Sequence, residues 1–375
     1  MLEAKRAPDD VDLNPRPLLS ICIPTCNRAN FLKAMLQALL PQVREVGQQV
    51  EVWVLDNAST DETAQILEES KGLGSFLIFQ QAENVGPTKN IVYGPTKLAR
   101  GEYVWVLGDH NLLRPNALSE VLQFIESHRS FQAIYANFRC ATYPDHWPES
   151  ACNGYDGSFA YLGNPELTAD RVDRWTNLLR PYSAACTQNY AHIVKTNVWS
   201  QFWKERSTGP DYSDAVTTYP HTVTILRSVG HLPAAVIRDP VITIFNGAQS
   251  WSNPETRFRV YFLGFTGLLK EFAACGLSGS QLKDLKESFF YIEACRLVLD
   301  SYRRFGRIRT LQLFLKCSTF NWYSFAVFLR TLPAGFFPEF CGRVSRGYLG
   351  MKNHCSLYLL NFRPARWLRS RGWLK

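Results

Sequence analysis

The sequence lacks the long apolar segments that a membrane-spanning helix requires. Such a helix needs about 18 or more consecutive apolar residues, and no run of that kind occurs in the 375 residues. The first 16 residues are polar, with none of the apolar core of a secretory signal peptide. We therefore predict a flexible leader over residues 1–16 and a cytoplasmic location.

Cysteine is present, but not in the patterns that bind metal. None of the ten cysteines belongs to a Cys-x-x-Cys pair, and no cluster of His or Cys accompanies Cys22 and Cys26 in the sequence. We expect buried, reduced thiols and no zinc site. No internal repeat is visible. The content of 46% hydrophobic and 20% charged residues is typical of a globular chain.

Acidic residues are almost missing from the last fifth of the chain. From residue 301 onward there are fourteen lysines and arginines against one acid, Glu339, whereas the first 300 residues have a net charge of −5. The net charge of +8 therefore originates in the C-terminal region. We predict that residues 251–375 form a basic, aromatic and mainly helical region with its own surface.

Strand and helix patterns alternate over the first 110 residues. The predicted strands are 18–24, 50–55, 76–79 and 103–107, and the predicted helices are 31–40, 63–70 and 90–99. This alternation predicts the α/β class, with a parallel sheet flanked by helices. Polar residues follow the first, second and fourth strands, and such loops gather at one edge of a parallel sheet.

The rest of the chain gives a less regular pattern. Helices are predicted at 114–129, 171–179 and 193–203, from about residue 219 to 227, and over most of the chain from 254 onward; strands are predicted at 131–138 and 236–245. Residues 140–170 are rich in Pro, Gly, Asn and aromatic residues. We expect this segment to be an irregular loop that covers the site.

Asp109, His110 and Asn111 directly follow the fourth predicted strand, which ends at Gly108. A carboxylate in this position can bind a divalent cation, and the cation can bind a phosphate group. Asn111 can coordinate through its amide oxygen, more weakly than a carboxylate does, and His110 favours a metal such as manganese. The alternative is a polar turn that binds nothing.

Polar residues at the ends of the other predicted strands can likewise have either a ligand-binding role or a structural role. Asp56 can accept the N3–H of a pyrimidine base, or it can stabilise the start of a helix. Thr25 and Asn27 can contact a base and a ribose. Asp61 is expected to cap the helix that follows it. Lys89 can contact a diphosphate or remain a solvated surface lysine.

Four motifs occur in the order in which family 2 glycosyltransferases have them. Residues 23–28 resemble a strand ending in Pro-Thr-x-Asn-Arg, and residues 54–61 resemble the second strand with its Asp-Asn-x-Ser loop. Residues 84–90 resemble an Asn-x-Gly element followed by Lys-Asn, and residues 101–111 resemble the Gly-Glu-Tyr strand that ends in Asp-x-Asp. The last motif departs from the family pattern, because Asn111 replaces its second carboxylate. The resemblance covers about residues 18–245.

The resemblance implies the GT-A type (nucleotide-diphospho-sugar transferase) fold over residues 17–250, a mostly parallel sheet flanked by helices. It implies a nucleotide-binding half at 17–111 and an acceptor half at 112–250. The implied ligands are a nucleotide-diphospho-sugar and Mn²⁺ or Mg²⁺, with Asp109 and Asn111 as metal ligands. The residues implied in donor binding are Pro24, Thr25, Asn27, Arg28, Asp56, Asn84, Gly86, Lys89, Gly108, Asp109 and His110.

The catalytic base is the least defined part of the expected site. Family members often have a Glu-Asp pair at the start of a helix, and the corresponding helix here begins with Pro220 and His221. His221 is one candidate, since an unperturbed pKa of about 6.5 suits base catalysis. Asp214 or Asp211, just upstream, is another, and a site without a base is the third possibility. The Tyr-Pro-His start also resembles bacterial members that transfer deoxysugars in surface-polysaccharide assembly.

The expected activity is the metal-assisted transfer of a single sugar, with inversion, to a glycan or a lipid-linked acceptor. One alternative is a non-catalytic nucleotide-sugar-binding or scaffold protein, which the missing Glu-Asp pair keeps open. Another is a sugar nucleotidyltransferase, although residues 24–28 lack the Gly-rich loop usual in that class. The basic C-terminal region is expected to pack on the sheet or to contact the inner face of a membrane peripherally. Nucleic acid is not an expected partner.

Overall fold

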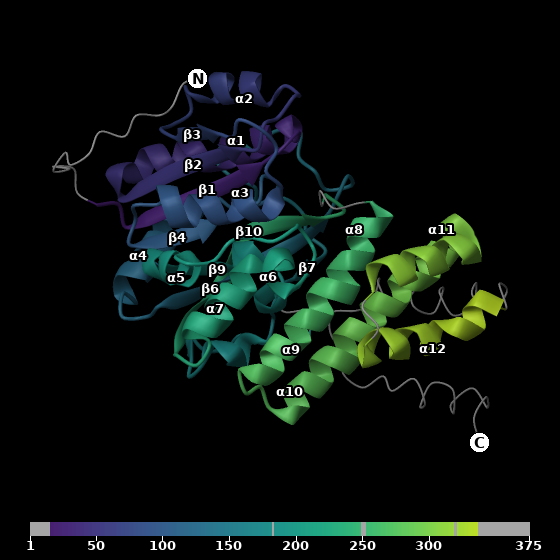
Figure 1. Cartoon of the computed structure of the whole chain (residues 1–375). Coiled ribbons are helices and arrows are strands. Elements are labelled where there is room, and N and C mark those ends of the chain that lie inside the picture. The colour runs from purple at the N-terminus through teal and green to yellow at the C-terminus, as the bar shows by residue number, and fades with distance from the viewer. Residues whose placement is uncertain (1–15, 182–183, 249–252, 319–320, 337–375) are drawn as a thin grey trace.

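The structure is a computed structural model that describes residues 16–181, 184–248, 253–318 and 321–336 (Figure 1). The leader predicted at residues 1–16 therefore lies almost wholly outside the described residues. The same holds for the boundary predicted at residue 250 and for the last 39 residues of the basic region.

Parallel strands form the first half of the sheet. They are β1 (Leu19–Thr25), β2 (Val50–Asp56), β3 (Leu77–Gln80) and β4 (Tyr103–Val106). Their order is β3-β2-β1-β4, and every neighbouring pair is parallel. Strands β1, β2 and β4 are mostly apolar because both of their faces are covered, and the burial of β1 and β4 is almost complete, whereas the edge strand β3 is largely exposed. The predicted α/β arrangement is confirmed in this half.

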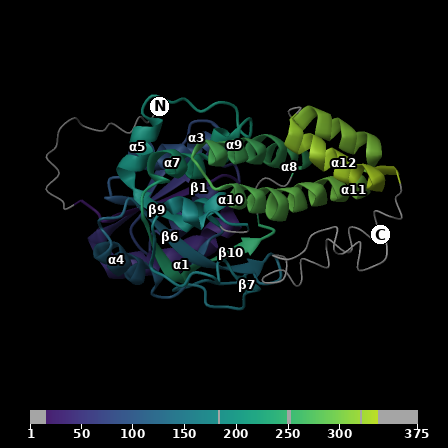
Figure 2. The same cartoon turned by 90° about the horizontal axis from the view of Figure 1, so that it is seen from below.

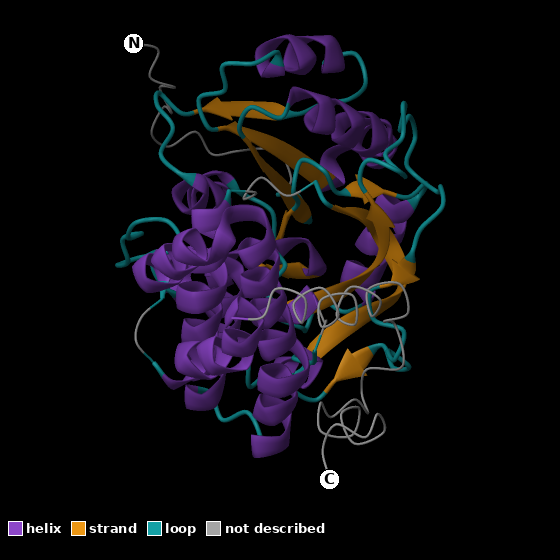
Figure 3. Ribbon diagram, turned by 90° about the vertical axis from the view of Figure 1, so that its right-hand side faces the viewer, coloured by secondary structure: helices purple, strands orange, loops and turns teal. Residues whose placement is uncertain are grey.

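The second half of the sheet is mixed. It contains β5 (Leu112–Leu113), β6 (Ala133–Thr142), β7 (Tyr161–Leu162), β8 (Arg171–Val172), β9 (His192–Lys195) and β10 (Ala234–Asn246). Strand β9 lies antiparallel between β4 and β6, while β10 runs parallel to β6. The described residues thus form a ten-stranded sheet that curves around the core (Figure 3).

Helices cover the sheet on both faces. They are α1 (Ala29–Val46), α2 (Thr63–Ser70), α3 (Pro87–Tyr93), α4 (Ala117–Ser127), α5 (Thr196–Trp203), α6 (Ala215–Thr218) and α7 (Pro220–Val229). Helix α1 shows why the predicted pattern worked, because Leu32, Leu36, Leu39 and Val43 recur every three or four residues and are all buried.

Two predicted helices are wrong in part. Residues 171–179 form β8 and a short 3₁₀ turn at Trp175–Leu178, because the chain pairs with the edge of β10 there. Residues 193–195 belong to β9, where Ile193 and Val194 lie between two partner strands. In both segments the apolar spacing imitates a helix, and pairing with strands distant in sequence overrides it.

The C-terminal helices pack as a layer beside the sheet (Figures 1 and 2). They are α8 (Pro254–Arg259), α9 (Thr266–Ala274), α10 (Gly279–Asp284), α11 (Tyr291–Cys317) and α12 (Trp322–Phe336), with π-helical segments at Val260–Phe265 and Leu285–Phe290. The predicted helical character is confirmed for the described residues. This layer is joined to the sheet domain, since Arg227 pairs with Glu271 at 2.6 Å and Tyr219 packs on Phe265. No helix among the described residues has the length and apolarity to cross a membrane.

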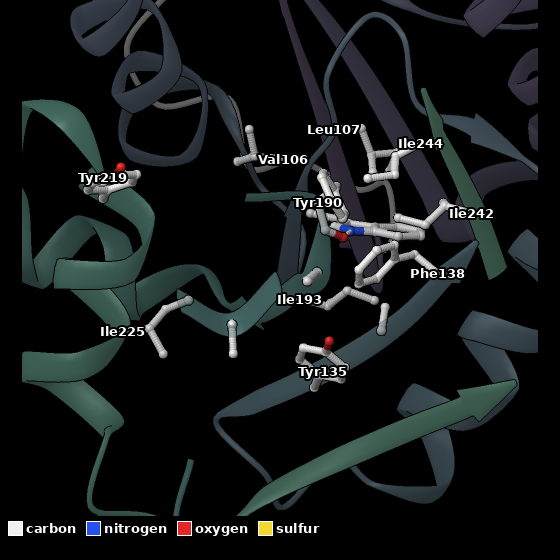
Figure 4. Close-up of a cluster of buried hydrophobic side chains, with 14 of the residues drawn as sticks. Val106, Leu107, Tyr135, Phe138, Tyr190, Ile193, Tyr219, Ile225, Ile242 and Ile244 are labelled. Atoms are coloured by element: carbon white, nitrogen blue, oxygen red, sulfur yellow. Dashed lines mark hydrogen bonds between the residues drawn. The ribbon is translucent and has the colours of Figure 1, made fainter. Parts of the chain in front are cut away.

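A buried apolar cluster lies under the carboxyl ends of β4 and β6 (Figure 4). The indole N–H of Trp105 donates to the Tyr190 carbonyl at 2.7 Å, and the Tyr190 ring meets Phe138 edge-on at 5.3 Å. This cluster forms the packed layer beneath the candidate site.

Candidate functional site

Three segments distant in sequence meet at Asp109, beyond the carboxyl ends of β1 and β4. The Arg28 Nε–H donates to Asp109 Oδ1 at 2.8 Å, and the Thr25 hydroxyl donates to Oδ2 at 2.9 Å. Arg28 also donates to the carbonyl of Ala248, just after β10, at 2.6 Å. Asp109 is only 3% exposed and Arg28 is half-buried, so the carboxylate of this ion pair is buried at the point where the loops converge.

Asp109 stays ionised despite its burial. Burial would by itself raise its pKa, but a hydrogen bond from His110 and the nearby Arg28 guanidinium outweigh that effect and lower the pKa below its ordinary value. His110 Nδ1 lies 3.0 Å from Asp109 Oδ1. The buried Asp109 carboxylate therefore contacts both the Arg28 guanidinium and the His110 imidazole.

Asn111 makes its hydrogen bonds within the turn that follows β4. Its Oδ1 accepts the Gly108 N–H at 2.7 Å, and its own N–H donates to the Gly108 carbonyl at 3.0 Å. Its buried Nδ2 has no hydrogen-bond partner among the described residues. The amide oxygen that was predicted to bind metal is thus engaged by the backbone.

The residues around Asp109 could hold a divalent cation only if a bound ligand supplied further coordinating atoms. Among the described residues, no three side chains of His, Cys, Asp or Glu are grouped to hold a metal ion. Both oxygens of Asp109 already accept hydrogen bonds from Arg28 and Thr25. An oxygen-ligand cation of this size needs about six ligands, so most would have to come from a bound diphosphate and water.

Asparagines brace the nucleotide-side loops against one another. Asn57 Nδ2 donates to Asn84 Oδ1 at 3.0 Å, and Asn57 Oδ1 accepts the Val85 N–H at 2.9 Å. Asn27 adopts a left-handed φ of 53° and accepts the Thr60 N–H at 2.7 Å. These bonds join the ends of β1 and β2 to the turn before α3.

The predicted donor residues divide into two groups. Those that line the large cavity at the strand ends are Pro24, Thr25, Arg28, Asn84, Gly108, Asp109 and His110. Asn27, Asp56, Gly86 and Lys89 do not line it. Asp56 is buried and accepts the Ser59 N–H at 3.0 Å, so its carboxylate holds the turn after β2. Asp61 accepts the N–H groups of Ala29 and Thr63, which confirms its predicted structural role.

The cavity has a volume of about 1420 Å³ and continues from Asp109 to the C-terminal helices. Its far wall includes Tyr261, Phe265, Phe289 and Glu293. Three of these belong to the two π-helical segments, a distortion that is frequent at functional sites. The sequence assigned these residues to a separate helical region, since local widening of a helix leaves no readable pattern.

His221 is the titratable residue at the start of α7 that lines the cavity. It is 6% exposed, and neither ring nitrogen has a hydrogen-bond partner among the described residues. Burial lowers its pKa to about 4, so the imidazole is neutral at pH 7. Its ring stacks on that of His192 with 6.2 Å between centroids. His192 was not among the predicted site residues; it lies directly before the segment 193–203 that was predicted as a helix, and it is the first residue of β9.

The two aspartates upstream of His221 have structural partners. Asp214 is exposed, lies outside the cavity lining and caps α6 by accepting the Thr217 N–H at 2.8 Å. Asp211 accepts the Thr88 N–H at the start of α3 at 3.0 Å and packs against Gly86, where a Cβ would have no room. Of the three residues predicted as the base, His221 is thus the one that lines the cavity.

Comparison with known proteins places these features in context. Residues 20–183 match the family described as Glycosyl transferase family 2. The chain is 26% identical over 274 residues to abequosyltransferase RfbV of Salmonella typhimurium, covering 70% of this chain and 77% of the relative. It is 32% identical over 123 residues to a PGL/p-HBAD biosynthesis glycosyltransferase of Mycobacterium tuberculosis, which covers 32% of this chain and 46% of that relative.

Among solved structures, the fold resembles that of residues 1–349 of S. aureus TarS, with a TM-score of 0.50 and 18% sequence identity. That match covers 77% of this chain and 73% of the TarS chain. The relative of that name is a poly(ribitol-phosphate) beta-N-acetylglucosaminyltransferase. The likeness confirms the predicted fold class.

Proposed function

We propose that this chain, whose residues 20–183 match the family described as Glycosyl transferase family 2, transfers one sugar from a nucleotide-diphospho-sugar to a glycan or lipid-linked acceptor. The observation that carries the proposal is the cavity itself. It joins the ionised Asp109, on the loops at the strand ends, to the unpartnered imidazole of His221.

The donor occupies the side of the cavity lined by the β1, β2 and β4 loops. Thr25 and Arg28 lie next to the position of the nucleotide, and Asn27 and Asp56 hold the loops that shape it. Arg28 and His110 supply positive or hydrogen-bond-donating groups toward the diphosphate. Gly86 gives the turn before α3 its left-handed conformation, and Lys89, which is exposed, attracts the donor's charge from outside.

A divalent cation, Mn²⁺ or Mg²⁺, would be held by Asp109 together with the donor diphosphate, and when bound it would neutralise charge on the leaving group. Asn111 would contribute by keeping the turn closed around Asp109. Arg28 must exchange part of its contact with Asp109 for contact with the diphosphate, since both cations compete for the same carboxylate.

His221 acts as the general base in this proposal. The neutral imidazole accepts the proton of the acceptor hydroxyl while the hydroxyl oxygen bonds to the anomeric carbon and the bond from that carbon to the diphosphate oxygen breaks. A single displacement of this kind inverts the anomeric centre. The nearby negative diphosphate would raise the pKa of His221 from its low value in the free protein, which makes it a better base when the donor is bound.

The acceptor occupies the far side of the cavity, between β7 and the C-terminal helices. Tyr261 and Phe289, which are half-buried, offer aromatic faces that suit the apolar faces of sugar rings, and Glu293 offers a carboxylate for hydroxyl groups. The sugar transferred is proposed to be a deoxyhexose. The support is the Tyr-Pro-His start of α7 and the similarity to RfbV, since abequose belongs to that class of sugars.

A donor screen tests this function. The purified chain is incubated with UDP-, GDP-, dTDP- and CDP-sugars in the presence of Mn²⁺ or Mg²⁺, and release of the nucleoside diphosphate is measured with Asp109→Ala as control. We expect one base to give release that the control lacks. If a donor bound but no sugar was transferred to any acceptor, the alternative of a non-catalytic nucleotide-sugar-binding protein would be favoured. If no donor was bound or turned over, the proposal would be contradicted.

A further inference from the structure

The second half of α11 and the helix α12 expose a set of large apolar side chains. Ile308 is 78% exposed, Leu315 is 67% exposed and Trp322 is 72% exposed. Three further residues, which are 36% to 49% exposed, complete the set, here called the apolar face. It consists of Ile308, Leu311, Leu315, Trp322, Phe325 and Leu329. Single exposed apolar residues are common, but a group confined to two neighbouring helices marks a site of interaction.

The apolar face is separate from the side chains that hold these helices in place. On the same helices Leu313, Phe314 and Val327 are buried, and Phe314 meets Phe328 at 5.7 Å between ring centroids. The helices therefore have one apolar side that packs in the core and a second that is exposed in the part of the chain that the structure describes. Within each helix the exposed residues recur every three, four or seven positions, as expected for one helix face.

The helical segments that carry the apolar face have a positive net charge. Residues 301–336 contain six arginines or lysines and no acidic residue. Two of the six are neutralised by neighbouring helices, since Lys316 pairs with Glu255 and Arg330 with Glu287. Arg304 and Arg309, on either side of the bend at Gly306, are exposed like Ile308. Arginine at the edge of exposed Ile, Leu and Trp is the composition of a segment that lies at the headgroup level of an anionic bilayer.

We infer that the apolar face binds an anionic lipid surface. Two other occupants fit less well. Residues 337–375 contain eight basic residues and one acid, so charge repulsion opposes their covering a face already flanked by arginines. A second copy of the chain would bring the same positive charge against itself. Only an anionic surface satisfies both the apolar and the basic part of this face.

The position of the apolar face suits the proposed transfer to a lipid-linked acceptor, and this part of the inference rests on that function. Helix α11 begins beside the cavity, where Glu293 forms part of the wall, and it bends at Gly306, which has a φ of 76°. The twelve helical steps from Glu293 to Phe305 span roughly 18 Å. A sugar acceptor anchored in the bilayer would thus be held within about that distance of the cavity.

Vesicle flotation with the full chain tests the inference. Vesicles of phosphatidylcholine alone are compared with vesicles that contain about one third phosphatidylglycerol, at about 0.15 M salt. We expect flotation with the anionic vesicles only. The triple variant Ile308→Ser, Leu315→Ser, Trp322→Ser should lose more than tenfold of the binding, and Arg304→Gln with Arg309→Gln about fivefold per arginine.

The matched control changes an apolar pair elsewhere. Leu77 and Ile78 on β3 are 41% and 43% exposed, and their replacement by Ser should leave flotation unchanged. Thermal unfolding of each variant verifies that the fold persists. An Asp109→Asn variant should float like the unchanged chain, so that a failure of the transferase function is distinguished from a failure of lipid binding.

Three results would overturn the inference. The first is the absence of flotation of the unchanged chain with anionic vesicles. The second is equal flotation of the folded triple variant. The third is a dimer, seen by light scattering, that the triple variant dissociates, because the apolar face would then be an interface between two copies.

Discussion

The half-buried Arg28 and the buried Asp109, which are 81 residues apart, form an ion pair between two loops. The Nε–H of Arg28 lies 2.8 Å from one carboxylate oxygen and 3.0 Å from the other. The Arg28 guanidinium also lies over the Phe31 ring at 4.1 Å. The pair therefore has two functions at once, since it holds the β1 and β4 loops together and carries the charges that a diphosphate would meet.

Removing the cation of this pair should weaken the fold as well as donor binding. In Arg28→Gln the carboxylate of Asp109 stays buried without its ionic partner, and such a change costs roughly 3 kcal/mol. Urea unfolding measures this cost. The comparison is Asp109→Asn, which removes the charge itself and should be less destabilising. If Arg28→Gln were as stable as the unchanged chain, the pair would not hold the loops.

Metal binding should depend on the nucleotide. Asp109 is one carboxylate already occupied by Arg28 and Thr25, so Mn²⁺ alone should leave the thermal midpoint unchanged. Mn²⁺ together with the matching nucleoside diphosphate should raise the midpoint more than the diphosphate alone does, because ligands that bind the folded state stabilise it. A large shift with Mn²⁺ alone would contradict this dependence.

The nucleotide side of the site was predictable because its signals are local. A strand such as β4 is apolar along its whole length, and the polar residues that end it must lie beyond the sheet. The motif therefore placed Thr25, Arg28 and Asp109 at one edge before any contact was known. Which of the neighbouring residues face the cavity was not predictable, since the partner of Asp56 or Asn111 is decided by backbone geometry.

The side of the cavity proposed for the acceptor was not predictable, because its residues meet through contacts between segments distant in sequence. His192 and His221 are 29 residues apart and meet because β9 inserts between β4 and β6, a pairing that local spacing does not reveal. The wall that contains Phe289 and Glu293 comes from helices that the charge pattern assigned to a separate region. Net charge describes the surface of a region and does not indicate which of its residues line a cavity.

His221 should control the rate, and Asp214 should not. Replacement of His221 by Asn keeps a polar side chain at the site but removes the base, so kcat should fall about 10²- to 10⁴-fold with the donor KM nearly unchanged. Asp214→Asn loses part of the cap of α6, which costs at most about 1 kcal/mol in unfolding free energy, and kcat should persist. Steady-state kinetics of both variants decide this, and the reverse pattern would make Asp214 the base.

The stability of the fold should fall as the pH is lowered from about 6.5 to 4. Burial lowers the pKa of His221 from 6.5 to about 4, so over this range the unfolded chain binds a proton that the folded chain does not. The loss should reach about 3 kcal/mol at the acidic end, and His192, whose pKa burial also lowers, adds to it in the same direction. Asp109 does not contribute to this loss, because its lowered pKa keeps the carboxylate ionised between pH 6.5 and 4. Its protonation affects stability only at lower pH. Urea unfolding at several pH values checks the slope, which should be smaller in His221→Asn, and an equal slope in both proteins would show that His221 is not buried in its neutral form.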